Sequence, residues 1–215
     1  MRAIRRHASK RWMVASALAL LAAACSQLAP RGDVQRPPAA AVAHPDAIEW
    51  TLDPVHTRIV IAVDHAGFSR AIGTVSGTTG TLSLVPDGWD GAQVVADIPL
   101  SRLDFGDEAW NRAVAGAALL DSGRHPVAGF RSTGVEPLDA SRARIRGQLT
   151  LRGTTREVVL DAVRNAERRH PLPPFRQTIG FSATTTLSRS AFGSTAWGSM
   201  VGDSVEVRIE LEASR

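Results

Sequence analysis

The feature that most constrains the fold is a period-two alternation of apolar residues, which recurs from residue 48 to the end of the chain. It is clearest in the last stretch, where Val205, Val207, Ile209 and Leu211 alternate with charged residues. Successive side chains of a β-strand point to opposite faces, so each such strand has one apolar and one polar face. Strands of this kind pair antiparallel, with one face in the core and the other in water. The chain is therefore predicted to be all-β.

Seven further runs show the same alternation and predict strands of about five to ten residues. Turn signals such as Asp90-Gly91 and Arg152-Gly153 separate them. Short strands at this spacing indicate a β-sandwich or a closed barrel, and the long last strand is placed to close against the first. The apolar positions are Ile48, Trp50 and Leu52; Ile59, Ile61 and Val63; Leu82 and Leu84; Val94, Ala96, Ile98 and Leu100; Ile145, Gly147, Leu149 and Leu151; Val158, Leu160 and Ala162; and Ile179, Phe181, Ala183 and Leu187.

One segment has a different pattern. Residues 108–120 contain many alanines and few β-branched residues, with Trp110 and Val114 at helical spacing. We expect a short helix here, lying beside or over the barrel. Pro126 ends this connection, and residues 127–135 resume as a strand.

The amino terminus has the marks of an export signal. A basic region without acidic residues precedes an apolar run, residues 13–24, that ends in small residues before Cys25. Cys25 is the only cysteine, and its position resembles the lipidation site of bacterial lipoproteins; simple signal cleavage is the alternative. We therefore predict a signal peptide over 1–24, a Pro/Ala-rich tether over 25–46 that starts at a lipidated Cys25, and a barrel domain over 47–215. This organisation predicts an exported, periplasmic, membrane-anchored lipoprotein.

Charge excludes one class of partner. The formal net charge of +4 comes from 25 basic and 21 acidic residues, but five of the basic residues lie in the signal and leave 20 against 21 afterwards. The chain from Cys25 onward is therefore almost neutral. It has no basic stripe interleaved with aromatic residues, so nucleic acid binding is not indicated.

Catalytic and metal motifs are weak in this sequence. Asp53, His56, His65 and His125 are the candidate metal ligands, but their spacing matches no established site, and an odd separation places His56 and His65 on opposite faces of one strand. Ser190 is not in a nucleophile elbow, and no phosphate-binding glycine loop is present in the sequence. We predict no catalytic residue, no metal and no cofactor. An enzyme would require Asp53, His56 and His125 to converge.

A small barrel without catalytic groups commonly holds an apolar ligand. The inward residues here are mostly aliphatic, which fits either a ligand cavity or a solid core. Small residues at the inward positions Ala96, Gly147, Ala162 and Ala183 favour a cavity.

Six segments resemble the YceI-like polyisoprenoid-binding family, and they occur in that family's order. They are WTLDPVHTRI at 50–59 with VDHAGFS at 63–69, PVAGFRST at 126–133, GQLTLRGTTR at 147–156, GFSA at 180–183, and SRSAFG at 188–193. The helix departs from the family pattern, with Leu119-Leu120-Asp121 where Phe-Phe-Asp is usual, which leaves the head-group preference open.

The resemblance implies a lipocalin-like antiparallel eight-stranded β-barrel with one short helix in a long connection. It also implies non-catalytic binding of an isoprenoid lipid, such as a quinone tail or a polyprenyl phosphate, in an elongated tunnel. His65 and Arg189 are expected at the polar head of the ligand. The residues expected to line the tunnel are Ile61, Val63, Phe130, Leu149, Phe181 and Ile209.

Two other functions compete with lipid carriage. The first is an envelope scaffold whose barrel is solid, and the second is the metal-dependent enzyme that would use Asp53, His56 and His125. The sequence leaves the oligomeric state open, a homodimer included.

Overall fold

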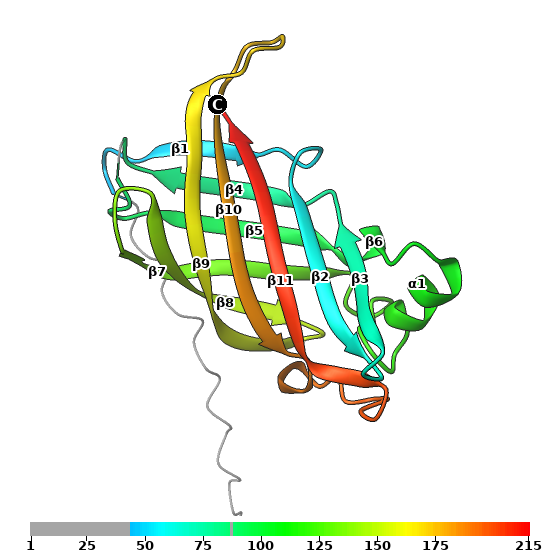
Figure 1. Ribbon diagram of the computed structural model, residues 1–215. Coiled ribbons are helices and arrows are strands. Elements are labelled where there is room, and N and C mark those ends of the chain that lie inside the picture. Colours follow the sequence, from blue (N-terminus) through cyan, green and yellow to red (C-terminus); the bar gives the residue numbers. More distant parts are fainter. Residues whose placement is uncertain (1–43, 87) are drawn as a thin grey trace, which may run out of the picture. The chain divides into compact units, whose positions relative to one another are not determined.

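The protein folds into an antiparallel β-barrel with one flanking helix (Figure 1). The structure is a computed structural model and describes residues 44–86 and 88–215. The predicted signal and most of the predicted tether lie outside these residues. The described strands are β1 (Ile48–Leu52), β2 (Arg58–His65), β3 (Ser69–Val75), β4 (Thr79–Leu84), β5 (Gln93–Pro99), β6 (Leu103–Asp104), β7 (Val127–Pro137), β8 (Arg142–Leu151), β9 (Thr154–Arg169), β10 (Gln177–Ser188) and β11 (Val201–Ser214).

The barrel closes where the sequence predicted that it would. The strand order β1-β4-β5-β7-β8-β9-β10-β11 becomes a ring of eight because β1 also pairs with β11, with Leu52 opposite Ala213. Every pairing is antiparallel. The predicted eight-stranded, lipocalin-like barrel is therefore confirmed.

The other three strands extend this ring at the end where the helix lies. Most of β11 pairs with β2, with Arg58 opposite Glu210, so β1 and β2 follow each other along one edge of β11. The next strand along the sheet is divided in the same way, because β4 pairs with β1 and β3 pairs with β2. The short strand β6 pairs with the other edge of β3. Three long barrel strands are thus each broken into two segments. Along this edge β3 pairs with β6 only at Thr74 and Val75, and α1 lies near it (Figure 1).

The sequence pattern missed β3 for a physical reason. Its buried positions are Ala71, Gly73 and Val75, of which two are too small to stand out as an apolar face. The outward residue Ile72 is apolar and 59% exposed, which obscures the alternation further.

Helix α1 (Glu108–Ala115) is shorter than the predicted 108–120. Asp107 caps its first turn by accepting hydrogen bonds from the backbone N–H groups of Ala109 and Trp110, both at 2.9 Å. The helix stops at Gly116, a residue of low helix propensity, and residues 117–120 form turns instead. No helix within residues 44–86 and 88–215 is long and apolar enough to cross a membrane.

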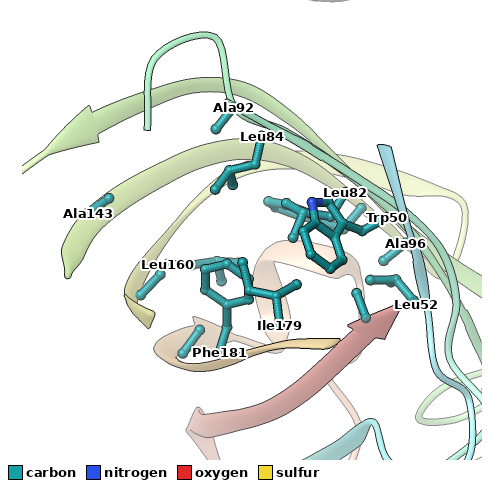
Figure 2. Close-up of a cluster of buried hydrophobic side chains, with 14 of the residues drawn as sticks. Trp50, Leu52, Leu82, Leu84, Ala92, Ala96, Ala143, Leu160, Ile179 and Phe181 are labelled. Carbon is teal, nitrogen blue, oxygen red and sulfur yellow. The ribbon is translucent and has the colours of Figure 1, made fainter. Parts of the chain in front are cut away.

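The barrel is packed solid towards the end that contains β1 (Figure 2). Trp50 and Leu52 of β1 are each 2% exposed, and Ile179 of β10 and Ala213 of β11 are fully buried. The guanidinium of Arg215 covers the Trp50 ring at 4.7 Å. These four residues therefore form part of the packed core of the barrel.

Candidate functional site

An inner cavity of about 200 Å³ lies inside the barrel wall. Five residues predicted to contact a ligand line it: Ile61, Phe130, Leu149, Phe181 and Ile209. They come from β2, β7, β8, β10 and β11, whose inward faces meet because the ring closes. The period-two pattern therefore located the interior correctly. Whether these residues bind a ligand stays a prediction.

An outer cavity of about 430 Å³ lies at the end where α1 packs. Its wall includes Val63 and His65 of β2, Arg189 after β10, and residues of α1 and of the 190–200 loop. Trp110 of α1 contacts His65, with ring centroids 5.2 Å apart, which fixes the helix at this opening. The remaining three predicted site residues are therefore gathered here.

The two cavities adjoin each other. Six residues line both of them: Ile61, Val75, Leu100, Leu151, Leu187 and Val207. All six side chains are aliphatic, so the wall that the two cavities share is apolar. The arrangement is an elongated apolar interior with its wider chamber beneath α1.

Among the described residues, those that line the outer cavity include charged side chains, and those that line the inner cavity do not. Arg189 donates three hydrogen bonds to backbone carbonyls of its own loop, those of Gly202, Ser194 and Val201, at 2.9, 2.6 and 2.8 Å. Its guanidinium thus holds the loop between β10 and β11. The role predicted for Arg189 at a ligand head group stays a prediction.

Sequence reasoning missed Arg152, which lies in the β8–β9 turn with a positive φ of 56°. Its guanidinium donates to the carbonyls of Ala117 and Gly193, each at 2.5 Å. These carbonyls belong to the loop after α1 and the loop after β10, so Arg152 links two loops that border the outer cavity. Only the tertiary structure shows this link, because the three positions are far apart in sequence.

The small inward residues have two different roles. Ala96, Ala162 and Ala183 line the inner cavity, as the sequence led us to expect. Gly147 does not contribute free space, because a Cβ placed there would lie 2.3 Å from Cζ of Phe130. The Phe130 ring fills the position above Gly147 instead.

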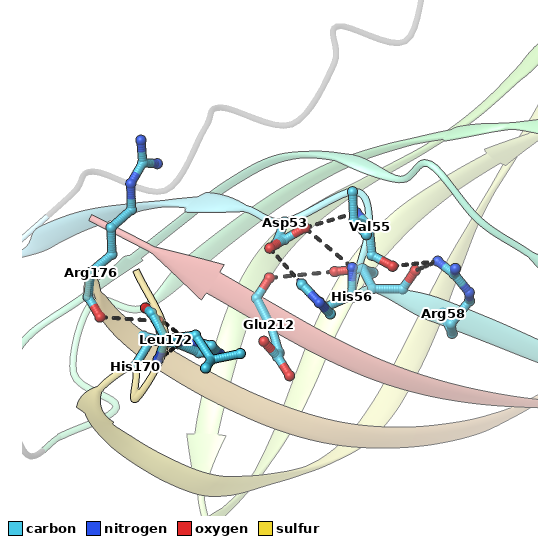
Figure 3. A network of polar contacts seen from close by, with 10 residues as sticks. Asp53, Val55, His56, Arg58, His170, Leu172, Arg176 and Glu212 are labelled. Atoms are coloured by element: carbon cyan, nitrogen blue, oxygen red, sulfur yellow. Dashed lines mark hydrogen bonds and ion pairs between the residues drawn. The ribbon is translucent and has the colours of Figure 1, made fainter. Parts of the chain in front are cut away.

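The three residues required by the enzyme hypothesis do not converge. Asp53 and His56 lie together in the β1–β2 turn, with Asp53 Oδ2 2.8 Å from His56 Nδ1 (Figure 3). His125 packs instead against Gly153 in the β8–β9 turn. Within the described ranges no three His, Cys, Asp or Glu side chains are placed to hold a metal ion.

The Asp53–His56 contact shifts the pKa of both side chains and lies within the turn between β1 and β2. Partial burial acts to raise the pKa of the Asp53 carboxyl group, but hydrogen bonds from His56 and from backbone N–H groups lower that pKa overall. The hydrogen bond to Asp53 raises the pKa of the His56 imidazole. Asp53 also accepts from the backbone N–H of Val55 at 2.8 Å, which stabilises the turn between β1 and β2.

Comparison with known proteins gives one family. A model described as the YceI-like domain matches residues 50–213. A UPF0312 protein of Pseudomonas putida is 30% identical over 154 residues, covering 68% of this chain and 77% of the relative. A UPF0312 protein of Vibrio cholerae is 26% identical over 167 residues, covering 77% and 87%.

Solved structures share the fold at lower identity. BcnA of Burkholderia cenocepacia matches with a TM-score of 0.67 at 22% identity, covering 75% of this chain and 99% of that protein. A polyisoprenoid binding domain from Saccharophagus degradans matches with a TM-score of 0.54 at 14% identity, covering 77% and 97%. At these identities the likeness establishes a common barrel architecture.

Proposed function

The chain belongs to the YceI-like domain family, and from this premise we propose that it is a non-catalytic binding protein for a long apolar isoprenoid lipid. The observation that carries the proposal is the pair of adjoining apolar cavities inside a closed barrel. The Saccharophagus degradans relative, described as a polyisoprenoid binding domain, supports the class of ligand.

The physical basis is removal of apolar surface from water. Transfer of such surface into an apolar environment contributes about 25 cal/mol per Å². A chain that occupied both cavities would be enclosed mainly by aliphatic and aromatic side chains. Ligand pockets for small molecules are typically about 300–1,000 Å³, a range that includes the outer cavity of about 430 Å³.

The structure bears on both competing functions. A scaffold with a solid barrel is disfavoured, because the interior towards α1 is hollow. The enzyme hypothesis required Asp53, His56 and His125 to meet, and His125 packs in a different turn.

Native mass spectrometry of the full chain, purified from a bacterial host with membranes, tests the proposal. We expect one bound lipid of the mass of a prenyl quinone or a prenyl phosphate, because the apolar interior favours a ligand over water. An empty protein that takes up neither lipid when both are added in detergent would contradict the proposed function.

We propose in addition that the protein is exported and anchored in the envelope through Cys25, which lies outside the described residues. The apolar run that ends before Cys25 supports this. One acyl chain anchors a protein only marginally, so stable attachment requires more than one chain on this cysteine.

Replacement of the cysteine tests the anchor. The Cys25→Ser variant should move from the membrane pellet to the soluble periplasmic fraction, because a serine cannot carry the thioether-linked lipid. Ser26→Ala is the matched control and should stay in the pellet. Membrane retention of Cys25→Ser would refute the lipid anchor and leave export intact.

A further inference from the structure

The hairpin between β9 and β10 projects beyond the barrel (Figure 1). Strand β8 pairs with β9 as far as Val163, and β11 pairs with β10 as far as Thr178. Residues 168–176, here named the hairpin tip, extend past both neighbouring strands, and all of them except His170 are exposed. Because the tip has left the core, its side chains are accessible to a partner outside the molecule.

Hydrogen bonds within the hairpin tip fix the course of its backbone. The backbone N–H of His170 donates to the carbonyl of Arg176 at 2.8 Å, and that of Phe175 donates to the carbonyl of Leu172 at 2.9 Å. Arg169 Nε donates to the carbonyl of Phe175 at 2.9 Å. Figure 3 shows the contacts of His170 with Arg176 and Leu172. The tip is therefore a defined surface.

Two large apolar side chains of the tip face water. Leu172 is 63% exposed and Phe175 is 47% exposed. A single exposed apolar residue needs no explanation, but these two lie together at the end of a projecting hairpin. Neither side chain lines a cavity. Their apolar surface can be removed from water by a partner that covers the tip.

The rest of the hairpin tip is basic. It contains Arg168, Arg169 and Arg176 and no acidic residue. Among the described residues none of these three arginines forms an ion pair with a carboxylate. The acidic residue that precedes the tip, Glu167, forms an ion pair with Arg164 instead. The tip therefore carries uncompensated positive charge, which complements an anionic surface.

An anionic lipid bilayer matches both properties of the tip. Apolar side chains on a peripheral protein enter the boundary between head groups and acyl chains, and the cations behind them remain at the level of the head groups. Anionic lipids attract arginines that lie close to the membrane surface. The hairpin tip has this order, with apolar groups in its turn and arginines on both sides of them.

We propose that the hairpin tip docks the protein on an anionic phospholipid bilayer, with Leu172 and Phe175 inserted below the head groups and the three arginines at the lipid phosphates. Strand β9 begins at the turn of Arg152, which borders the outer cavity, and ends at the tip. The outer cavity and the docking surface thus lie at opposite ends of this strand. The proposal goes beyond the proposed function and does not depend on it.

A fluorescent label at the tip tests the insertion. Cys25 is the only cysteine, so Cys25→Ser in the full chain removes both the proposed acyl anchor and the competing thiol. In this background Leu172→Cys carries an environment-sensitive dye, whose emission should shift to the blue when vesicles of phosphatidylglycerol and phosphatidylcholine are added. The same dye on Thr184→Cys, at an exposed position on the wall of the barrel, should not shift.

Charge removal tests the contact with the phosphates. Arg168→Gln and Arg176→Gln should each weaken binding to the mixed vesicles about fivefold, equal to about 1 kcal/mol. Arg156→Gln is the matched control, because it removes an exposed arginine from the same strand β9 outside the tip, and it should bind as the parent chain does. Cosedimentation with the vesicles measures the affinity, which should fall as salt screens the exposed charges.

Several results would overturn the proposal. They are unchanged emission of the Leu172→Cys label on addition of the mixed vesicles, equal affinity for vesicles of phosphatidylcholine alone, and equal losses in Arg168→Gln and Arg156→Gln. A tip that docks on a protein would give the first of these results. Uptake of a prenyl lipid should be the same in all these variants, because the tip lines neither cavity. Failure of that uptake in the unchanged chain would contradict lipid carriage and not the docking surface.

Discussion

Ala183→Phe is expected to abolish binding of a prenyl lipid, with an affinity loss of more than about 100-fold, equal to about 2.7 kcal/mol. Ala183 of β10 lines the inner cavity beside Phe181 and is 9% exposed. The added phenyl ring is the size of benzene, which itself fits a cavity of about 150 Å³. It should therefore occupy the space that the ligand requires. Titration calorimetry with a prenyl quinone in detergent measures the loss.

The adjacent residue supplies the control for this substitution. Thr184 is exposed on the outer face of the same strand, so Thr184→Phe adds the same ring outside the barrel and should keep full affinity. Overpacking a core costs about 1–3 kcal/mol, so the thermal unfolding of both variants is measured alongside. Full affinity in a folded Ala183→Phe variant would show that the ligand does not enter the inner cavity.

The barrel itself was predictable because its signal is local. Alternation within a strand decides which residues face inward, and Ile61, Leu149, Phe181 and Ile209 were placed in the interior from that signal. The closure of the last strand on the first was also expected, and in the structure Ala213 and Ser214 make it by pairing with Leu52 and Thr51.

The sequence predicted only in part which inward positions border empty space and which are filled by a neighbouring side chain. Ala183 and Gly147 look alike in sequence, as small residues at inward positions. In the structure Ala183 borders empty space, whereas the ring of Phe130 from the neighbouring strand covers Gly147. Which small residue leaves a cavity depends on the cross-strand neighbour, and a single strand pattern does not contain that information.

The outer cavity was the least predictable part. Its wall combines α1 with two loops that Arg152 links through the carbonyls of Ala117 and Gly193. Loop geometry depends on such long-range hydrogen bonds, so no periodicity in the sequence announces it. The residues Trp110 and Trp197 became candidates for the opening only when α1 and the 190–200 loop were seen to border it.

Gly80→Ala is expected to destabilise the protein by more than about 3 kcal/mol, a loss that few single substitutions reach. Gly80 of β4 has a φ of +148°, and a Cβ there would lie 2.0 Å from the carbonyl oxygen of Val95 in β5. The atom that the new Cβ would meet belongs to the backbone, so no change of side-chain rotamer can relieve the clash. The two strands must separate or the chain must leave its conformation.

The same approach of β4 and β5 shapes the binding site, which gives the substitution a second readout. Gly80 lies opposite Ala96 and two residues from Thr78, and both of these line the inner cavity. Separation of the strands should therefore weaken lipid binding as well as lower the urea midpoint of unfolding.

Gly134→Ala in β7 is the control for this effect. Gly134 has no positive φ, and a Cβ there would meet nothing within 4 Å. Alanine at a compatible glycine position stabilises by about 0.4–1 kcal/mol through the unfolded chain, so this variant should unfold at an equal or higher urea concentration. If Gly80→Ala matched Gly134→Ala in its urea midpoint, the close contact between β4 and β5 would be disproved. The inner cavity wall that depends on this contact would then have a different geometry.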